Sequence, residues 1–185
     1  MLNIKTLVLI FLPLFMFSQS YETQKYRLVN KIDNFEIRYY PKAIKAKVES
    51  NNNSNNNFMK LFRYISGNNE ANQKIAMTTP VYMRKNSVNS TMEFVMPSKF
   101  DMQSIAVPND KSVKIIESDA GFFASVRFGG YSNPSRQKKY TNELLQILES
   151  KDISYIGEPL LVSYNSPYKF FSRRNEIIIE INYNE

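Results

Sequence analysis

Residues 58–81 read FMKLFRYISGNNEANQKIAMTTPV, a stretch with a helical pattern followed by a strand-like one. Apolar side chains recur at positions i, i+3, i+4 and i+7 and so share one face of an α-helix; they are Phe58, Leu61, Phe62 and Ile65. Gly67 is well placed to end this helix, because glycine readily adopts the left-handed conformation common just beyond a helix C-terminus. A strand-like segment around residues 80–83 comes next, so the stretch predicts an amphipathic helix and then a strand.

The residues around this stretch show the patterns of strands and turns. In residues 43–48, Ile44, Ala46 and Val48 alternate with polar residues, which is typical of a half-buried strand. Residues 35–40 also favour an extended conformation, and residues 92–96 alternate before Pro97. Residues 51–57 read NNNSNNN and predict a solvated loop.

The second half of the chain shows the same order of patterns. Residues 113–116 and 122–128 are strand-like, and Asn133-Pro134 supplies an N-cap and a first-turn proline for a second helix. Strands are predicted at residues 160–164 and 176–182. Phe35 and Val113 are as far apart in the sequence as Ala46 and Ala124, which indicates two pseudo-repeats at about residues 33–105 and 111–183. Chance matching of alternating segments is the alternative.

The composition excludes several classes of chemistry. The 185 residues include no Cys, His or Trp, so a Ser-His-Asp triad, a thiol nucleophile and a histidine ligand for zinc or haem iron are all excluded. The formal net charge of +7 favours anionic partners, although a basic surface alone also explains it. Nucleic acid is not an expected partner, because the basic residues are scattered and no basic-aromatic cluster of a known type occurs.

Residues 1–20 have the three-part layout of a secretory signal peptide. Lys5 precedes an uninterrupted apolar run at residues 7–17, and Ser18 and Ser20 supply small residues before Tyr21. The run is shorter than the roughly 20 residues that span a bilayer. We therefore expect an exported protein, periplasmic or secreted, whose residues 21–185 form one domain with no stable membrane insertion after cleavage. A retained anchor is the alternative.

The chain resembles the SOUL haem-binding protein family. The resemblance rests on the order and spacing of several segments: residues 35–48 (FEIRYYPKAIKAKV), 58–81, 92–97 (MEFVMP), 128–131 (FGGY) and 173–176 (RRNE). It implies an α+β fold, a distorted β-barrel of two pseudo-repeated halves, each with strands and one long helix. It also implies that haem or a related tetrapyrrole binds an apolar face beside the first helix. No catalytic activity is implied, and we predict that the protein is not an enzyme.

The resemblance places the cofactor site on the first helix and the strand after it. Phe58, Met59 and Phe62 offer an aromatic and polarizable surface for a macrocycle, and Arg63 with Lys60 is expected to meet a propionate. Met77 completes the predicted cofactor-binding set. Without histidine, only Met or Tyr side chains remain as candidate iron ligands, and those nearest the motif are Met59, Met77, Tyr39 and Tyr64. Several of these residues equally suit a hydrophobic core.

Two other functions remain open from the sequence. The first is a small-molecule effector-binding or hydrolytic domain of the gyrase-inhibitor type, in which Glu93 or Glu176 would be a buried carboxylate with a raised pKa. The second is a protein-interaction module that uses the apolar first helix as its docking surface. No protein partner, catalytic residue or metal ligand is assigned.

Overall fold

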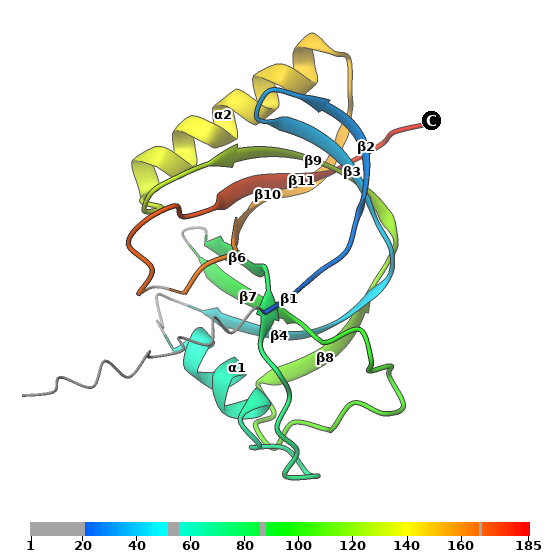
Figure 1. The fold of residues 1–185 in the computed structure, drawn as a ribbon, viewed down its shortest axis with the longest axis vertical. Helices are drawn as coiled ribbons and strands as arrows, with labels where there is room; N and C mark the ends of the chain where they lie inside the picture. Colours follow the sequence, from blue (N-terminus) through cyan, green and yellow to red (C-terminus); the bar gives the residue numbers. More distant parts are fainter. Residues whose placement is uncertain (1–20, 52–55, 86–87, 167) are drawn as a thin grey trace, which may run out of the picture.

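The computed structural model describes residues 21–51, 56–85, 88–166 and 168–185. The chain forms two helices and eleven strands in those ranges (Figure 1). Their bounds are β1 Glu22–Thr23, β2 Arg27–Ile32, β3 Phe35–Tyr40, β4 Ala43–Asn51, α1 Asn57–Ile65, β5 Thr78–Thr79, β6 Val81–Lys85, β7 Asn89–Val95, β8 Val113–Ser118, β9 Gly121–Phe128, α2 Pro134–Ser150, β10 Tyr155–Ser163 and β11 Asn175–Ile181. The expected signal peptide and residues 52–55 of the expected loop lie outside the described residues.

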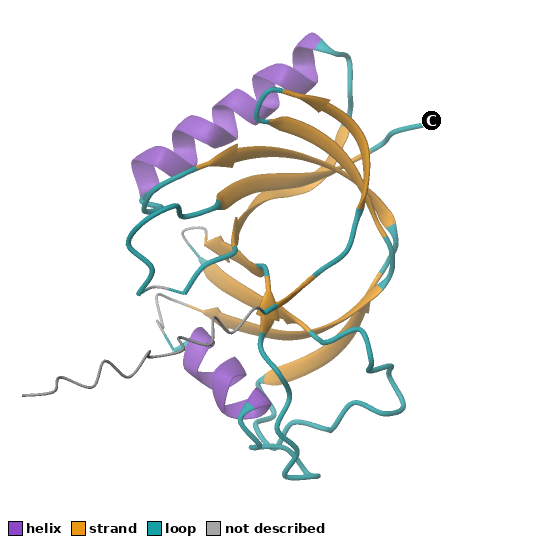
Figure 2. Cartoon of the chain, viewed as in Figure 1, coloured by secondary structure: helices purple, strands orange, loops and turns teal. Residues whose placement is uncertain are grey.

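Nine of the strands form one antiparallel sheet in the order β2-β3-β9-β11-β10-β6-β7-β4-β8, and β1 pairs with β5 in a separate parallel ribbon. The sheet is strongly curved, and both helices lie on its outer side (Figure 2). Among the described residues, β2 pairs only with β3 and β8 only with β4, so the hydrogen bonding does not close the sheet. The α+β class is therefore confirmed, but a closed barrel is not found. Neither described helix combines the length and apolarity needed to cross a membrane.

Each helix covers its own half of the sheet. Leu61, Tyr64 and Ile65 of α1 pack on β4, β7 and β8, and Leu144 and Leu148 of α2 pack on β9 and β11. A third cluster, which includes Tyr40, Tyr82 and Ile178, lies on the other face of the sheet. Residues 33–105 contain two strands, α1 and three further strands, of which β5 is only two residues long, whereas residues 111–183 contain two strands, α2 and two further strands. The internal duplication stays a prediction.

The ends of the helices follow from local sequence. The Asn133 side chain accepts the Arg136 N–H at 2.9 Å and caps α2, as predicted. Beyond α1, Gly67 has a φ of 115°, and the Asn68 N–H donates to the Arg63 carbonyl at 3.0 Å. The prediction of one long helix in each half is wrong for α1, which has nine residues against seventeen in α2. α1 ends at Ile65, because the left-handed conformation of Gly67 terminates the helix there.

The two ends of the Asn-rich segment belong to regular elements and not to the loop that its composition predicts. Asn51 is the last residue of β4, and Asn57 is the first residue of α1. Asn57 is buried, with 3% exposure, and its amide nitrogen donates to the Ser90 carbonyl at 3.2 Å. The amide therefore links the start of the helix to β7, which a compositional pattern does not reveal.

Candidate functional site

The outer flank of α1 carries large apolar side chains that the core does not cover. Phe58, Met59 and Phe62 are 38%, 43% and 44% exposed, whereas Leu61 on the facing side is fully buried. The rings of Phe58 and Phe62 are stacked with centroids 5.9 Å apart. The helical face predicted from periodicity therefore divides into a buried part and an exposed aromatic part.

A groove runs alongside this exposed flank. It consists of three adjoining hollows with volumes of about 490, 380 and 400 Å³. Phe58 and Val81 line the first two hollows, and Phe62 and Met77 line the first and the third, which makes the depression continuous. We call it the α1 groove. It lies between α1, the start of β6 and the segment that joins β10 to β11.

The charged side chains among the described lining residues of the α1 groove are all cationic. Its described lining residues include no Asp or Glu, while Lys74 lines the hollow at one end and Arg173 the hollow at the other. Arg173 Nη1 donates to the carbonyls of Ser166 at 2.9 Å and Lys169 at 2.7 Å, which fixes the guanidinium in place. An apolar surface with cations at its ends suits a flat apolar ligand that carries carboxylates.

Four of the five predicted cofactor-binding residues line this groove: Phe58, Met59, Phe62 and Met77. Arg63 is exposed but is not among the lining residues. A hydrogen bond from Ser112 is the main cause of the lowered pKa of Asp110, and the charges of Lys60 and Arg63 add to it. The positive charge of Arg63 therefore reaches Asp110. Contact between Arg63 and a ligand stays a prediction.

The candidate iron ligands differ in their access to the groove. Tyr64 is buried, its hydroxyl donates to the Ala106 carbonyl at 2.8 Å, and burial raises its pKa to about 12. Tyr39 lies on β3, where its ring is 5.2 Å from Phe122, and it is not a lining residue. Only Met59 and Met77 of the four candidates reach the groove. No three His, Cys, Asp or Glu side chains gather into a metal site within the described ranges.

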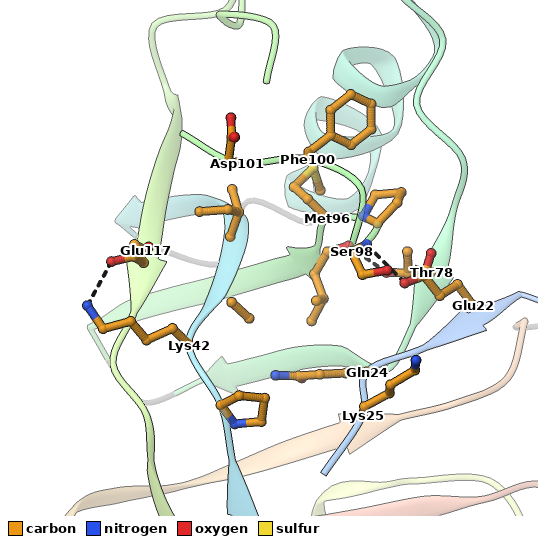
Figure 3. Close-up of a pocket in the computed structure, with 15 residues that line it drawn as sticks. Glu22, Gln24, Lys25, Lys42, Thr78, Met96, Ser98, Phe100, Asp101 and Glu117 are labelled. Atoms are coloured by element: carbon orange, nitrogen blue, oxygen red, sulfur yellow. Dashed lines mark hydrogen bonds and ion pairs between the residues drawn. The ribbon is translucent and has the colours of Figure 1, made fainter. Parts of the chain in front are cut away.

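A separate hollow of about 300 Å³ lies beside β4 and the segment after β7 (Figure 3). Its carboxylates already have partners. Glu22 accepts the Ser98 N–H at 2.9 Å, Glu117 pairs with Lys42 at 3.0 Å, and Asp101 accepts hydrogen bonds from Ser104. These contacts hold the walls of the hollow together, so it is a weaker candidate for a ligand site than the α1 groove.

The two glutamates of the rival enzyme prediction are engaged in ion pairs. Glu176 is fully buried and binds both Arg38, at 2.6 Å, and Arg174, at 2.7 Å. Burial acts to raise the pKa of Glu176, but the hydrogen bonds and charge of Arg38, together with Arg174, lower it below 4.5. Glu93 pairs with Lys45 at 3.1 Å. The raised pKa expected for a general base at Glu176 is therefore wrong.

Sequence reasoning missed most of the far wall of the groove. Tyr131, Asn165 and Tyr168 line it and come from segments without helical or strand periodicity. Lys74 lies within the stretch that predicts the helix and strand, but a single exposed lysine carries no signal. Arg173 belongs to the RRNE segment, in which Arg173 binds backbone carbonyls and Arg174 pairs with Glu176.

Comparison with known proteins identifies related sequences. The sequence profile described as "SOUL heme-binding protein" matches residues 21–180. "Heme-binding protein 1" of Mus musculus is 29% identical over 126 residues, which cover 64% of this chain and 66% of the mouse protein, just under two thirds of its length. "Heme-binding protein 2" of Homo sapiens is 32% identical over 160 residues, covering 78% of this chain and 76% of the human protein.

Solved structures share the fold at low sequence identity. The C-terminal domain of EcmrR superimposes with a TM-score of 0.59 at 12% identity, covering 85% of this chain and 98% of that domain. A hydrolase from Listeria innocua gives a TM-score of 0.56 at 10% identity, covering 80% of this chain and 92% of the hydrolase. Similarity at these identities establishes the fold alone, because one fold supports many functions.

Proposed function

This chain belongs to the SOUL haem-binding protein family, and on that premise we propose that residues 21–185 bind haem or a related tetrapyrrole in the α1 groove. The observation that carries the proposal is the make-up of the groove. Its described lining combines exposed aromatic and methionine side chains with two cations and no carboxylate. A tetrapyrrole has the matching chemistry, a broad apolar ring with carboxylates at one edge.

The residues of the groove have separate tasks in this proposal. Phe58, Met59 and Phe62 cover a face of the ring, and each fully buried side chain of this size contributes about 1.5–3 kcal/mol. Because the ring carboxylates lie at one edge, they meet the cation at one end of the groove, either Lys74 or Arg173. Bound haem would supply an iron centre, for which the thioethers of Met59 and Met77 are candidate side-chain ligands among the methionines and tyrosines of the described lining.

We further propose that the protein acts outside the cytoplasm, periplasmic or secreted, as a carrier, buffer or scavenger and not as an enzyme. The signal-like layout of residues 1–20 supports export, and the names of the mouse and human relatives support haem as the ligand. Engagement of Glu176 by two arginines removes the main candidate for a general base. Binding and release of an unmodified ligand then accounts for the groove.

Titration of the full chain with haem tests this proposal. We expect a saturable change in the Soret band at one haem per chain, with a spectrum that lacks histidine ligation. Metal-free protoporphyrin should compete for the same site, because the groove recognises the ring and its carboxylates. A haem signal that rises linearly without saturation, or that a porphyrin does not compete with, would contradict a defined site.

Charge reversal should show which cation meets the ring carboxylates. Lys74→Glu places a carboxylate in the lining of the groove, so we expect the Kd for haem to rise about tenfold or more, which corresponds to about 1.4 kcal/mol. Arg63→Glu makes the same change of charge at an exposed position of α1 outside the described lining of the groove, and it should raise the Kd less. A larger effect for Arg63→Glu would restore Arg63 as the contact. Soret titration of both variants provides the comparison.

A further inference from the structure

The segment that joins β10 to β11 exposes a group of aromatic side chains. Tyr168, Phe170 and Phe171 are 83%, 71% and 84% exposed, far more than the aromatic residues of α1. The segment extends from the sheet on the side where α1 lies (Figure 1). Tyr168 lines the α1 groove. Folded proteins rarely leave large apolar side chains so open unless the surface meets a partner or a membrane.

The charges of this segment are all positive. Residues 164–174 contain Lys169, Arg173 and Arg174 and no Asp or Glu. The Arg174 charge is compensated by Glu176, and Arg173 is held by backbone carbonyls and by the Tyr131 ring, 4.7 Å from its guanidinium. Lys169 is exposed and lies between Tyr168 and Phe170 in the sequence, so an exposed cation accompanies the exposed rings.

We propose that Tyr168, Lys169, Phe170 and Phe171 dock the protein on the surface of an anionic phospholipid bilayer. Aromatic rings are enriched at the boundary between headgroups and acyl chains, and a lysine beside them can reach the lipid phosphates. Attraction to anionic lipid adds to the apolar contribution. Docking of this kind is peripheral, inserts no helix, and does not depend on the proposed haem binding.

A membrane explains the segment better than a protein partner does. Lysine is depleted in the buried centre of protein interfaces, yet Lys169 lies among the exposed rings. Phe170 and Phe171 also remain open on most of their surface and do not form part of a packed face. The positive net charge of the chain favours the approach to an anionic surface.

The absence of tryptophan from the chain makes a direct test available. Phe171→Trp introduces a single fluorophore at a position that is 84% exposed, so the substitution should not disturb packing. With the ligand-free full chain and vesicles of phosphatidylglycerol and phosphatidylcholine, we expect a blue shift of the emission. Brominated lipids of the same composition should quench it. If the emission does not shift to the blue, the membrane proposal is overturned, and a protein becomes the favoured partner of this segment.

A matched reporter shows whether the contact is local. Met102→Trp places the fluorophore at an exposed position in the segment between β7 and β8, and its emission should not shift. Lys169→Gln, combined with Phe171→Trp, should reduce partitioning into the anionic vesicles about fivefold, as expected for one lost cation. Equal shifts for both reporters would show that another part of the chain causes the contact. Unchanged partitioning of the Lys169 variant would exclude recognition of anionic lipid by this segment.

Discussion

Replacing Phe62 by aspartate should abolish measurable haem binding and leave the protein folded. Phe62 lines two of the three hollows of the α1 groove and is 44% exposed, so its loss removes ligand contact more than core packing. The lost apolar contact accounts for about 1.5–3 kcal/mol. The new carboxylate of the protein repels the carboxylates of the ligand. The described lining of the groove otherwise contains no Asp or Glu. Together these effects should raise the Kd by about a hundredfold or more.

Val107→Asp is the matched control for this experiment. Val107 is 54% exposed and does not line the groove, so the variant carries the same added charge on another surface. Haem titrations of the two variants should differ sharply, while their circular dichroism spectra and unfolding midpoints should agree with those of the parent chain. Retained haem affinity in the Phe62 variant would place the ligand elsewhere on the molecule.

The sequence predicted most strands and both helices because their signals are local. Period-2 alternation located β4 and β9, and helical spacing with Gly67 located α1. The capping pair Asn133-Pro134 located the start of α2. Strand β2 was missed, because its residues are mostly exposed and show little alternation of apolar and polar character. Pairing between distant strands, and so the open edges of the sheet, has no signature in one sequence.

Arg38 shows where alternation fails. In β3, Phe35 and Ile37 pack under α2, so alternation would place Glu36 and Arg38 in solvent. Instead Arg38 is 1% exposed, because the sheet curves around this face and the Tyr26 ring covers the guanidinium at 4.4 Å. Curvature depends on the whole sheet, so no local pattern of residues 35–40 could predict it.

The candidate site was predictable only on the side that α1 provides. Its apolar flank follows from helical geometry, since Phe58 and Phe62 are four positions apart. The opposite wall comes from Tyr131, Tyr168 and Arg173, whose position depends on how β9, β10 and β11 pair. Arg63 illustrates the limit: its sequence position beside Phe62 suggests a groove contact, but Arg63 is not among the described lining residues, and its contact with a ligand stays a prediction.

The ion pair between Arg38 and Glu176 joins strands that are not neighbours. Arg38 lies on β3 and Glu176 on β11, with β9 between them. The register places Ser125 of β9 on the same face, and its small side chain leaves room for the guanidinium to reach across. Tyr164 also donates to Glu176, at 2.9 Å. The carboxylate therefore connects β11 to β3 and to the residue after β10, at a place that solvent does not reach.

Glu176→Gln should destabilise the protein by about 3–5 kcal/mol, the usual cost of removing one partner from a buried ion pair. Glutamine is nearly the same size, so the change creates no cavity. It leaves the buried Arg38 with Glu36 as its remaining counter-charge and removes the partner of Arg174. Urea unfolding followed by circular dichroism at pH 7 measures the loss. Glu117→Gln breaks the exposed pair with Lys42 and should leave the free energy of unfolding unchanged.

The pH dependence of this difference separates charge from shape. The pKa of Glu176 is lower in the folded protein than its ordinary value of 4.5, so its ionisation stabilises the fold fully above that pH. The contribution is lost as the pH falls from 4.5 through the lowered pKa. The difference in unfolding free energy between the parent chain and Glu176→Gln should therefore shrink in acid. A difference that stays constant from pH 7 to pH 3 would show that packing, and not the charge of Glu176, holds these strands together.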